Sequence, residues 1–317
     1  MSGKFVIGSR GSELALWQAS FVKHRLEAVS PQIEFQIKII KTTGDELLDR
    51  PLSAIGDKGL FTRQIENELI DGKIDLAVHS LKDLQTEQPD GLVIGAVCER
   101  EIPNDVLISK TAASIDELPL GARVATGSLR RQCQLLAYRP DLKIEDMRGN
   151  VPTRIRKFEE SDLDAMILAY AGVTRLGLDR YIKEIIPFEI MLPAVGQGAL
   201  AIEVRQDDTR TVEIVSKLND AGTRICVTAE RAFLRRLEGG CQVPIGAIAT
   251  VNNDQIMIEG VVGALDGSKI HRDGLDASID DAESAGIELA ERLIALGAKQ
   301  LLGNVRSQAA NENKAVL

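Results

Sequence analysis

The chain has 317 residues, of which 44% are hydrophobic and 27% charged, with a formal net charge of −9. This length predicts two or three domains of an ordinary globular protein. The acidic balance and an aromatic content of 3% exclude a typical nucleic-acid-binding protein, which needs basic surface and stacking side chains. The chain starts directly with a predicted strand, without the apolar segment of a signal peptide or a run of membrane-spanning length, so we expect a cytoplasmic protein.

The cysteines and histidines give no sign of a disulfide framework or of a metal centre. The four cysteines are scattered without a CxxC pair, and the three histidines lie far apart in the sequence. A reducing compartment disfavours disulfides, and this spacing gives no support for a zinc site. We therefore expect no metal.

The first hundred residues alternate between predicted strands and helices. Strands are expected at 4–8, 33–41, 74–78 and 92–97, and helices at 13–29 and about 60–71. Ser12 is the expected N-cap of the first helix, and residues 42–59 predict a long functional loop. Such alternation indicates an α/β sheet with parallel strands, in which ligands bind beyond the carboxyl ends of the strands. Arg10, Lys82 and Asp83 would lie there.

A similar pattern begins again near residue 104. Strands are expected at 122–125, 144–147 and 165–169, with helices at 129–138 and after the turn at 148–154. Arg130 and Arg131 fall in the first turn of the helix at 129–138, where positive charge opposes the helix dipole. An anion bound at that N-terminus would account for both residues. Two α/β domains around a cleft fit this arrangement.

The remaining residues predict a crossover and a smaller domain. Residues 192–198 look like a crossover loop, and a strand at 199–204 is expected to return to the first domain. From about residue 221 a helix, three or so strands with turns at 252–254 and 266–267, and a closing helix at about 281–302 predict a small α+β domain, with residues 307–317 frayed. The predicted domains are residues 1–98 with 199–216, residues 104–192, and residues 221–310.

Arginines of this acidic chain gather at or near predicted strand ends and turns that carry Gly, Ser or Thr. They are Arg10, Arg130, Arg131, Arg148, Arg154, Arg156 and Arg175. A single such arginine is usually a solvated surface charge. Recurrence at strand-to-helix turns instead indicates an anionic small-molecule ligand, because a guanidinium group pairs bidentately with carboxylates or phosphates.

Cys241 is the centre of an unusual stretch, LEGGCQVPIGA at residues 237–247. It lies between a predicted helix at 230–237 and a predicted strand at 245–251, on a tight loop that two glycines permit. An accessible thiol on such a loop suits covalent chemistry. The competing interpretation is a small buried hydrophobic residue.

Seven blocks of residues together resemble one family over nearly the whole chain. They are GSRGS at 8–12 with LALWQ at 14–18, GDKGLF at 56–61, DLAVHSLKD at 75–83, GSLRRQ at 127–132, RGNV at 148–151 with Thr153 and Arg154, LPAVGQG at 192–198, and residues 230–247. In this order and spacing the chain resembles the porphobilinogen deaminases, also called hydroxymethylbilane synthases.

The resemblance implies a fold and a reaction. It implies two α/β domains like those of type II periplasmic binding proteins, followed by a small α+β domain. It implies head-to-tail joining of four porphobilinogen units with loss of ammonia, then hydrolytic release of the linear tetrapyrrole hydroxymethylbilane in haem biosynthesis. A covalent dipyrromethane cofactor, held by a thioether to Cys241, primes the chain, and the family implies a monomer whose partner is the small-molecule substrate porphobilinogen.

The resemblance also assigns roles to single residues. Asp83 matches the catalytic carboxylate, which would help ammonia leave, stabilise the cationic azafulvene and assist proton loss. The residues implied to hold the cofactor are Cys241, Lys82, Ser128, Arg130, Arg131, Asp45 and Thr126. Those implied to bind substrate carboxylates are Arg10, Ser12, Arg148, Arg154 and Arg175, and those of a lid are Lys58 and Phe61. Without the resemblance, Asp83 would be interpreted as a surface carboxylate paired with Lys82.

Some features depart from the family pattern or allow another interpretation. Gln85 stands where a proline is usual, which puts the positioning of Asp83 in question; Ala125-Thr-Gly127 and Ala201 are lesser departures. His79 and Ser80 lack the nucleophile elbow of a hydrolase, so we expect His79 to be structural. A rival function is a solute-binding or effector-sensing module, which would explain the arginines but not Cys241 or a third domain.

Overall fold

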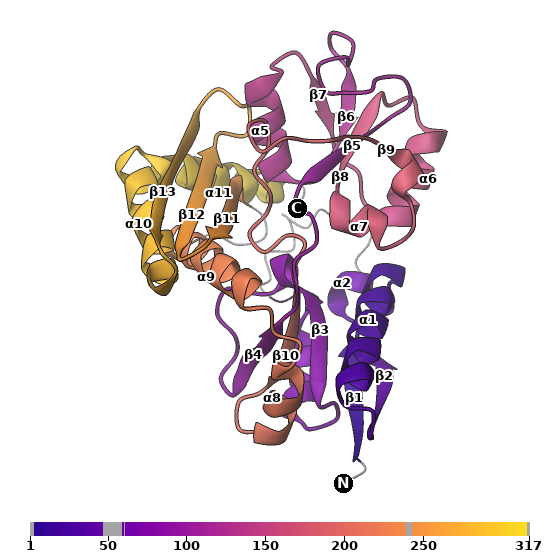
Figure 1. Cartoon of the computed structure of the whole chain (residues 1–317). Coiled ribbons are helices and arrows are strands. Elements are labelled where there is room, and N and C mark those ends of the chain that lie inside the picture. Colours follow the sequence, from indigo (N-terminus) through magenta and orange to yellow (C-terminus); the bar gives the residue numbers. More distant parts are fainter. Residues whose placement is uncertain (1–2, 47–58, 60, 239–242, 316–317) are drawn as a thin grey trace. The chain divides into compact units, whose positions relative to one another are not determined.

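The computed structural model describes residues 3–46, 59, 61–238 and 243–315, with the backbone alone described at 45–46 and 308–315 (Figure 1). The chain divides into two compact units. Unit 1 comprises residues 1–48, 57–101 and 198–224, and unit 2 comprises residues 49–56, 102–197 and 225–317. No helix in the described ranges is long and apolar enough to cross a membrane.

Unit 1 is built on a five-stranded sheet in the order β2-β1-β3-β10-β4. The strands are β1 (Gly3–Ser9), β2 (Ile33–Ile39), β3 (Leu76–Ser80), β4 (Leu92–Val97) and β10 (Leu200–Arg205). β1 is parallel to β2 and β3, but β10 is antiparallel to β3 and β4. The expectation of parallel strands is wrong for β10, because this strand enters directly from a crossover loop without the helix that a parallel connection needs. Its predicted return to the first domain is confirmed.

Helices cover both faces of this sheet. They are α1 (Glu13–Val29), α2 (Thr43–Glu46), α4 (Arg63–Ile70) and α8 (Thr209–Ser216). α1 begins as predicted, since the Ser12 side chain accepts a hydrogen bond from the backbone N–H of Ala15. Leu76 and Val78 of β3 join the core shared with α1 and α8, whereas Ala77 joins the core under α4. This alternation with a period of two is what a strand covered on both faces requires.

The first sheet of unit 2 has the order β7-β6-β8-β5-β9. Its strands are β5 (Asp105–Ser109), β6 (Arg123–Ala125), β7 (Lys143–Glu145), β8 (Ala165–Ala169) and β9 (Ile182–Ile185), and its helices are α5 (Leu129–Tyr138), α6 (Val151–Glu160) and α7 (Tyr170–Thr174). β6 is parallel to β7 and β8, whereas β5 is antiparallel to β8 and β9. In both sheets the fourth strand is the antiparallel one and follows a passage between units. This confirms two α/β sheets built alike.

A second, three-stranded sheet completes unit 2. β11 (Ile245–Asn252), β12 (Gln255–Gly263) and β13 (Ile270–Ser278) form an antiparallel meander beside α9 (Ala221–Arg236), α10 (Ala282–Ala295) and α11 (Ala298–Ala315). Its two turns contain Asn253 and Gly267 with positive φ, as the predicted turns require. The prediction of a single closing helix at about 281–302 is wrong. Gly297 has φ +106 and ends the first of two helices. The predicted fraying from residue 307 is also wrong, since α11 continues to Ala315.

The two sheets of unit 2 are joined through α5. The Gln132 side chain donates to the Leu265 carbonyl at 3.1 Å, and a Cβ placed on Gly267 would lie 2.4 Å from the Ala137 nitrogen. The backbone therefore approaches α5 more closely than a residue with a side chain would allow. The helix that carries Arg130 and Arg131 is fixed from both sides. Three short 3-10 helices complete the described elements: η1 (Leu81–Asp83), η2 (Asp179–Tyr181) and η3 (Ile279–Asp281).

Candidate active site

Asp83 is the last residue of η1, a tight corner that follows the buried strand β3. The corner is fixed by two backbone hydrogen bonds, from Leu81 N to the Ala199 carbonyl at 3.0 Å and from Leu84 N to the Leu81 carbonyl at 3.2 Å. Leu81 is buried and Asp83 is exposed. Within the described part of the chain, the Asp83 carboxylate forms no hydrogen bond or ion pair, so the alternative pairing with Lys82 is not formed. The fold presents this carboxylate without committing it to a structural contact.

His79 and Ser80, just before this corner, do not act on one another. The Nε2 atom of His79 lies 3.1 Å from Oε2 of Glu203 on β10, and both side chains are buried. The Ser80 hydroxyl accepts a hydrogen bond from the Gln18 amide at 2.8 Å. His79 thus has the structural role expected of it, with its ring turned to a carboxylate of the neighbouring strand.

The carboxyl end of β1 in unit 1 carries Arg10 and Ser12. Ser12 caps α1, and the guanidinium carbon of Arg10 lies 4.2 Å from the centre of the Phe61 ring. Phe61 packs against Gly44, where an added Cβ would lie 2.1 Å from the ring. The family resemblance implies that Phe61 belongs to a lid. In the structure its ring packs against the guanidinium group of Arg10.

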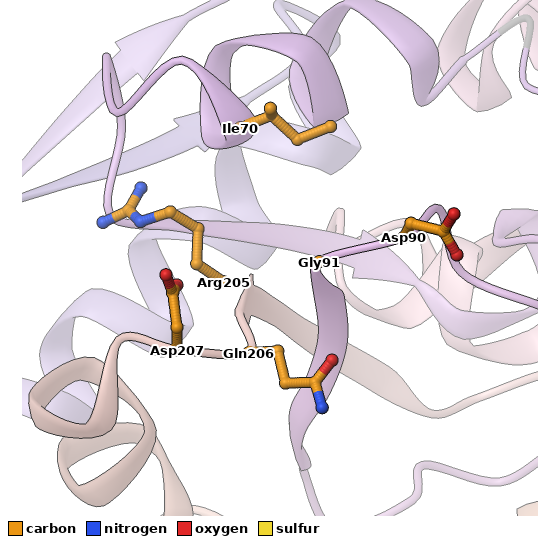
Figure 2. Close-up of a pocket in the computed structure, with 6 residues that line it drawn as sticks. All are labelled: Ile70, Asp90, Gly91, Arg205, Gln206 and Asp207. Atoms are coloured by element: carbon orange, nitrogen blue, oxygen red, sulfur yellow. The ribbon is translucent and has the colours of Figure 1, made fainter.

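A pocket of about 520 Å³ in unit 1 is unrelated to these residues. Figure 2 shows its lining residues, which are Ile70, Asp90, Gly91, Arg205, Gln206 and Asp207. β10 pairs Leu200 with Ser80, beside the Asp83 corner, and ends at Arg205. Five residues of strand separate these two ends by roughly 16 Å. Arg205 donates to the carbonyls of Leu69 and Ile74 at 2.8 and 2.7 Å, so it has a structural role at the opposite edge of the sheet.

In unit 2 the predicted residues collect at the carboxyl ends of the three parallel strands. Thr126 and Ser128 follow β6, Arg148 and Arg154 follow β7, and Arg175 follows β8. Because β7, β6 and β8 are adjacent and parallel, these residues share one edge of the sheet, as predicted. The partners of four of these side chains, Thr126, Ser128, Arg148 and Arg154, are local backbone or side-chain groups.

Those partners hold the loops in shape. Ser128 caps α5, with its hydroxyl accepting from Arg131 N, and the Thr126 hydroxyl accepts from Ser128 N at 3.2 Å. Arg148 contacts Asp146 at 3.3 Å, and Arg154 donates from Nε to the Gly149 carbonyl at 2.7 Å. The turn expected to run to residue 154 is shorter, because Asn150 caps α6 and places Arg154 inside that helix.

Arg130 and Arg131 differ most from the expectation. Both side chains are buried, and the carboxylate between them belongs to Asp105 at the start of β5. Nη1 of Arg130 donates to Oδ2 of Asp105 at 2.7 Å, and Nη2 of Arg131 donates to Oδ1 at 2.8 Å. The Asp105 carboxylate therefore balances part of the positive charge in the first turn of α5.

The electrostatics of this cluster follow from burial and pairing. Burial alone would raise the pKa of the Asp105 carboxyl, but Arg130 and Arg131 outweigh it and hold that pKa well below its usual range. Burial lowers the pKa of Arg131, as does the neighbouring Arg130, while Asp105 opposes both. The Asp105 carboxyl is consequently ionised at neutral pH, and it faces guanidinium groups, which stay protonated in proteins.

Sequence interpretation missed Asp105, although a signal was present. The strand DVLIS at 105–109 opens with a charged residue and is otherwise apolar or small, and all five residues are buried. A carboxylate in that position needs a buried cationic partner. Gln197, which donates to Asp105 Oδ1 at 3.0 Å, was likewise missed as part of the cluster.

Three predicted site residues cannot be placed. Cys241 and Lys58 lie outside the described residues, and so does the side chain of Asp45, whose backbone belongs to α2.

Comparison with protein families covers most of the chain. Residues 5–213 match the model of "Porphobilinogen deaminase, dipyromethane cofactor binding domain", and residues 224–295 match "Porphobilinogen deaminase, C-terminal domain". The chain belongs to the porphobilinogen deaminase family. Individual relatives agree with this family assignment.

A porphobilinogen deaminase of Pelotomaculum thermopropionicum is 52% identical over 312 residues, covering 98% of this chain and 100% of the relative. One of Chlorobium limicola is 54% identical over 311 residues, covering 96% and 99%. Among solved structures, a putative methionine-binding lipoprotein of Bacillus subtilis is similar with a TM-score of 0.43 and 13% identity, covering 69% of this chain and 92% of that one.

Proposed function

We propose that the chain is a hydroxymethylbilane synthase that joins four porphobilinogen units head to tail, releases ammonia at each step and hydrolyses the linear tetrapyrrole from its primer. Membership of the porphobilinogen deaminase family supports this reaction. The alignments with relatives cover 96–98% of this chain. The structural observation that carries it is the buried arginine pair, two guanidinium groups that share one carboxylate. Porphobilinogen carries an acetate and a propionate, so a chain of such units supplies the missing negative charge.

The residues present fit a dipyrromethane cofactor. Two buried arginines with one buried aspartate form a site with one positive charge in excess, and a carboxylate-bearing group is the partner such a site lacks. We propose that Arg130 and Arg131, with Lys82, Thr126, Ser128 and Asp45, hold this cofactor, and that Cys241 bears it through a thioether. When bound, the cofactor supplies the pyrrole carbon at which the chain grows.

Asp83 is the proposed catalytic residue. An exposed carboxylate without a structural partner can stabilise the positive charge that develops on porphobilinogen as its aminomethyl group leaves as ammonia. The same oxygen atoms can then accept the proton that is lost after the new carbon–carbon bond forms. Substitution of such a group costs catalysis while leaving the fold intact.

The other assigned residues bind and enclose the substrate. We propose that Arg10, Ser12, Arg148, Arg154 and Arg175 bind the acetate and propionate groups, and that Lys58 and Phe61 belong to a lid. The proposed domains are residues 1–98 with 199–216, which carry Asp83, residues 104–192, which carry the arginine pair, and residues 221–310, which carry Cys241. We further propose a cytoplasmic monomer with porphobilinogen as its small-molecule partner.

Intact-mass measurement tests the proposal. The purified full-length chain should be heavier than its sequence by two linked pyrrole units, and Cys241→Ser should remove this increment together with activity. A matched substitution at a buried cysteine, Cys226→Ser, should keep the increment. A fully active chain of unmodified mass would contradict the covalent cofactor, and a loaded chain that does not consume porphobilinogen would contradict the reaction.

A further inference from the structure

One carboxylate serves two buried guanidinium groups in unit 2. Asp105 has no exposed surface, and the side chains of Arg130 and Arg131 are 5% and 7% exposed. Arg131 donates to Asp105 Oδ1 from both Nε and Nη2, at 3.1 and 2.8 Å, and from Nη1 to the Ile167 carbonyl at 3.0 Å. Arg130 uses Nη1 alone, toward Asp105 Oδ2 at 2.7 Å and the Leu192 carbonyl at 2.8 Å. The two arginines are thus held unequally.

The unequal hold leaves particular donors for a ligand. Among the described residues, Nε and Nη2 of Arg130 have no protein acceptor, and neither atom is fully buried. These nitrogens therefore reach accessible surface, with three N–H groups on one rigid plane. The charge count agrees with this geometry, because two guanidinium groups and one carboxylate leave one positive charge uncompensated in a buried place. Leaving such a charge without a partner is costly.

Asp105 also ties the pair to the crossover segments of the chain. Gln197 donates from Nε2 to Asp105 Oδ1 at 3.0 Å and to the Pro103 carbonyl at 2.6 Å. Gln134, one turn after Arg130, donates to the Leu192 carbonyl at 3.1 Å and accepts from Leu192 N at 2.8 Å. The pair is consequently fixed by backbone and side-chain bonds on several sides, so its free donors keep one orientation.

We propose that Asp105 is a positioning residue: it fixes Arg130 and Arg131 so that the remaining N–H groups of Arg130 bind one carboxylate of the dipyrromethane cofactor, which neutralises the excess charge. This inference rests on the proposed role of the two arginines. Asp105 acts through them and does not touch the cofactor. Without it the guanidinium groups repel one another and lose the acceptor that sets their planes.

Asp105→Asn tests the inference with nearly unchanged shape. We expect the fraction of purified chain that carries the two-pyrrole mass to fall. We expect kcat per loaded molecule to fall about ten- to a hundredfold, the worth of one or two charge-assisted hydrogen bonds, with KM for porphobilinogen little changed. A role in stability alone would reduce the amount of folded chain and leave kcat per loaded molecule unaltered.

Asp164→Asn is the matched control, because Asp164 is a structural carboxylate of the same sheet that accepts from Arg123 N at 2.7 Å and does not contact the pair. It should load and turn over like the wild type. If Asp105→Asn matches this control in loaded fraction and in kcat per loaded molecule, the inference is wrong.

A second pair of variants keeps the test decisive if Asp105→Asn does not fold. Combining Asp105→Asn with Arg131→Gln restores the original buried charge of plus one, and this protein is compared with Arg131→Gln alone. We expect the double variant to load less and to turn over at least threefold more slowly, since Arg130 has also lost its acceptor. Equal behaviour of the two proteins would overturn the inference.

Arg130→Leu separates this inference from the proposed function beneath it. Impaired loading in Arg130→Leu with normal loading in Asp105→Asn would overturn the positioning role alone. Normal loading and turnover in Arg130→Leu would overturn the proposed role of the arginine pair, and with it the inference on Asp105.

Discussion

The guanidinium carbon of Arg10 lies 4.2 Å from the centre of the Phe61 ring, within the range of a cation–π interaction. The ring is itself confined, because Gly44 of α2 leaves no room for a side chain on that flank. A side-chain hydrogen bond from Gln64 to Thr43 ties the first turn of α4 to the same helix. Phe61 therefore restricts where Arg10, a proposed substrate-binding residue, can point.

Phe61→Leu should weaken substrate binding. Leucine keeps apolar volume beside Gly44 but has no π face for Arg10, and such an interaction is worth about 0.5–2 kcal/mol. We expect KM for porphobilinogen to rise roughly two- to thirtyfold, with loading of the cofactor unchanged by intact mass. Tyr181→Leu is the control, since it removes a comparable contact with Arg180 at 4.7 Å in η2. Equal KM values for both variants would refute the supporting role of Phe61.

Asp83→Asn should separate catalysis from stability. The carboxylate is exposed and has no partner in the described structure, so we expect the free energy of unfolding to change by less than about 0.5 kcal/mol. Turnover should fall by about 10²–10⁴, the usual contribution of a positioned proton-transferring group. The measurements are thermal unfolding and steady-state porphobilinogen consumption. Glu87→Gln, at a nearby exposed carboxylate, should be active; an active Asp83→Asn would remove Asp83 from the mechanism.

Gln85→Pro should leave the Asp83 corner intact. The family usually has proline here, and Leu84 before it already has φ −85 and ψ 138, the extended conformation that a following proline demands. Two backbone hydrogen bonds close the corner, from Leu84 N to the Leu81 carbonyl and from Leu81 N to the Ala199 carbonyl. We expect kcat within about threefold of the wild type, given an intact corner. A loss of a hundredfold with normal stability would show that Gln85 itself positions Asp83.

The elements that could be predicted are those whose signals are local. Ser12 caps its helix as expected because the N-cap bond joins residues three positions apart. β8 was predicted to the residue, since a buried apolar run between turns has few other solutions. β9 was not identified, because this short strand alternates Ile with Lys and Glu. The direction of β10 depends on which strands it meets, and no local pattern encodes that.

The candidate site divides in the same way. The edge formed by Ser128, Arg148 and Arg175 could be predicted because every residue follows a recognisable strand, and parallel strands align those ends. The partner of Arg131 could not be predicted from the sequence. Asp105 lies 26 residues earlier, and only the tertiary fold brings its strand beside α5. Arg130 and Arg131 in the first turn of α5 therefore correctly indicated a negatively charged partner. Part of that negative charge comes from the protein itself, as the carboxylate of Asp105.

The buried carboxyl of Glu66 gives unit 1 a predicted dependence on pH. Burial raises the pKa of Glu66 above its usual 4.5, and the neighbouring Glu203 raises it further, against the opposing effects of Thr62 and of the charges of His79 and Arg63. Between the ordinary and the raised pKa the folded chain holds a proton that the unfolded chain has released. The free energy of unfolding contributed by this group must therefore fall as pH rises through that window.

Glu66→Gln should abolish this contribution. An amide needs no proton to remain uncharged, and it removes the charge repulsion between Glu66 and the neighbouring Glu203. We expect the variant to equal or exceed the wild type in stability at pH 7 and to lose less stability between pH 5 and 7, measured by urea unfolding across that range. Glu68→Gln, two residues further along α4 at a carboxylate paired with Lys38 at 2.7 Å, should retain the wild-type slope. A Glu66→Gln protein that is less stable at pH 7 but keeps the wild-type slope would show that the carboxylate is ionised in the folded chain.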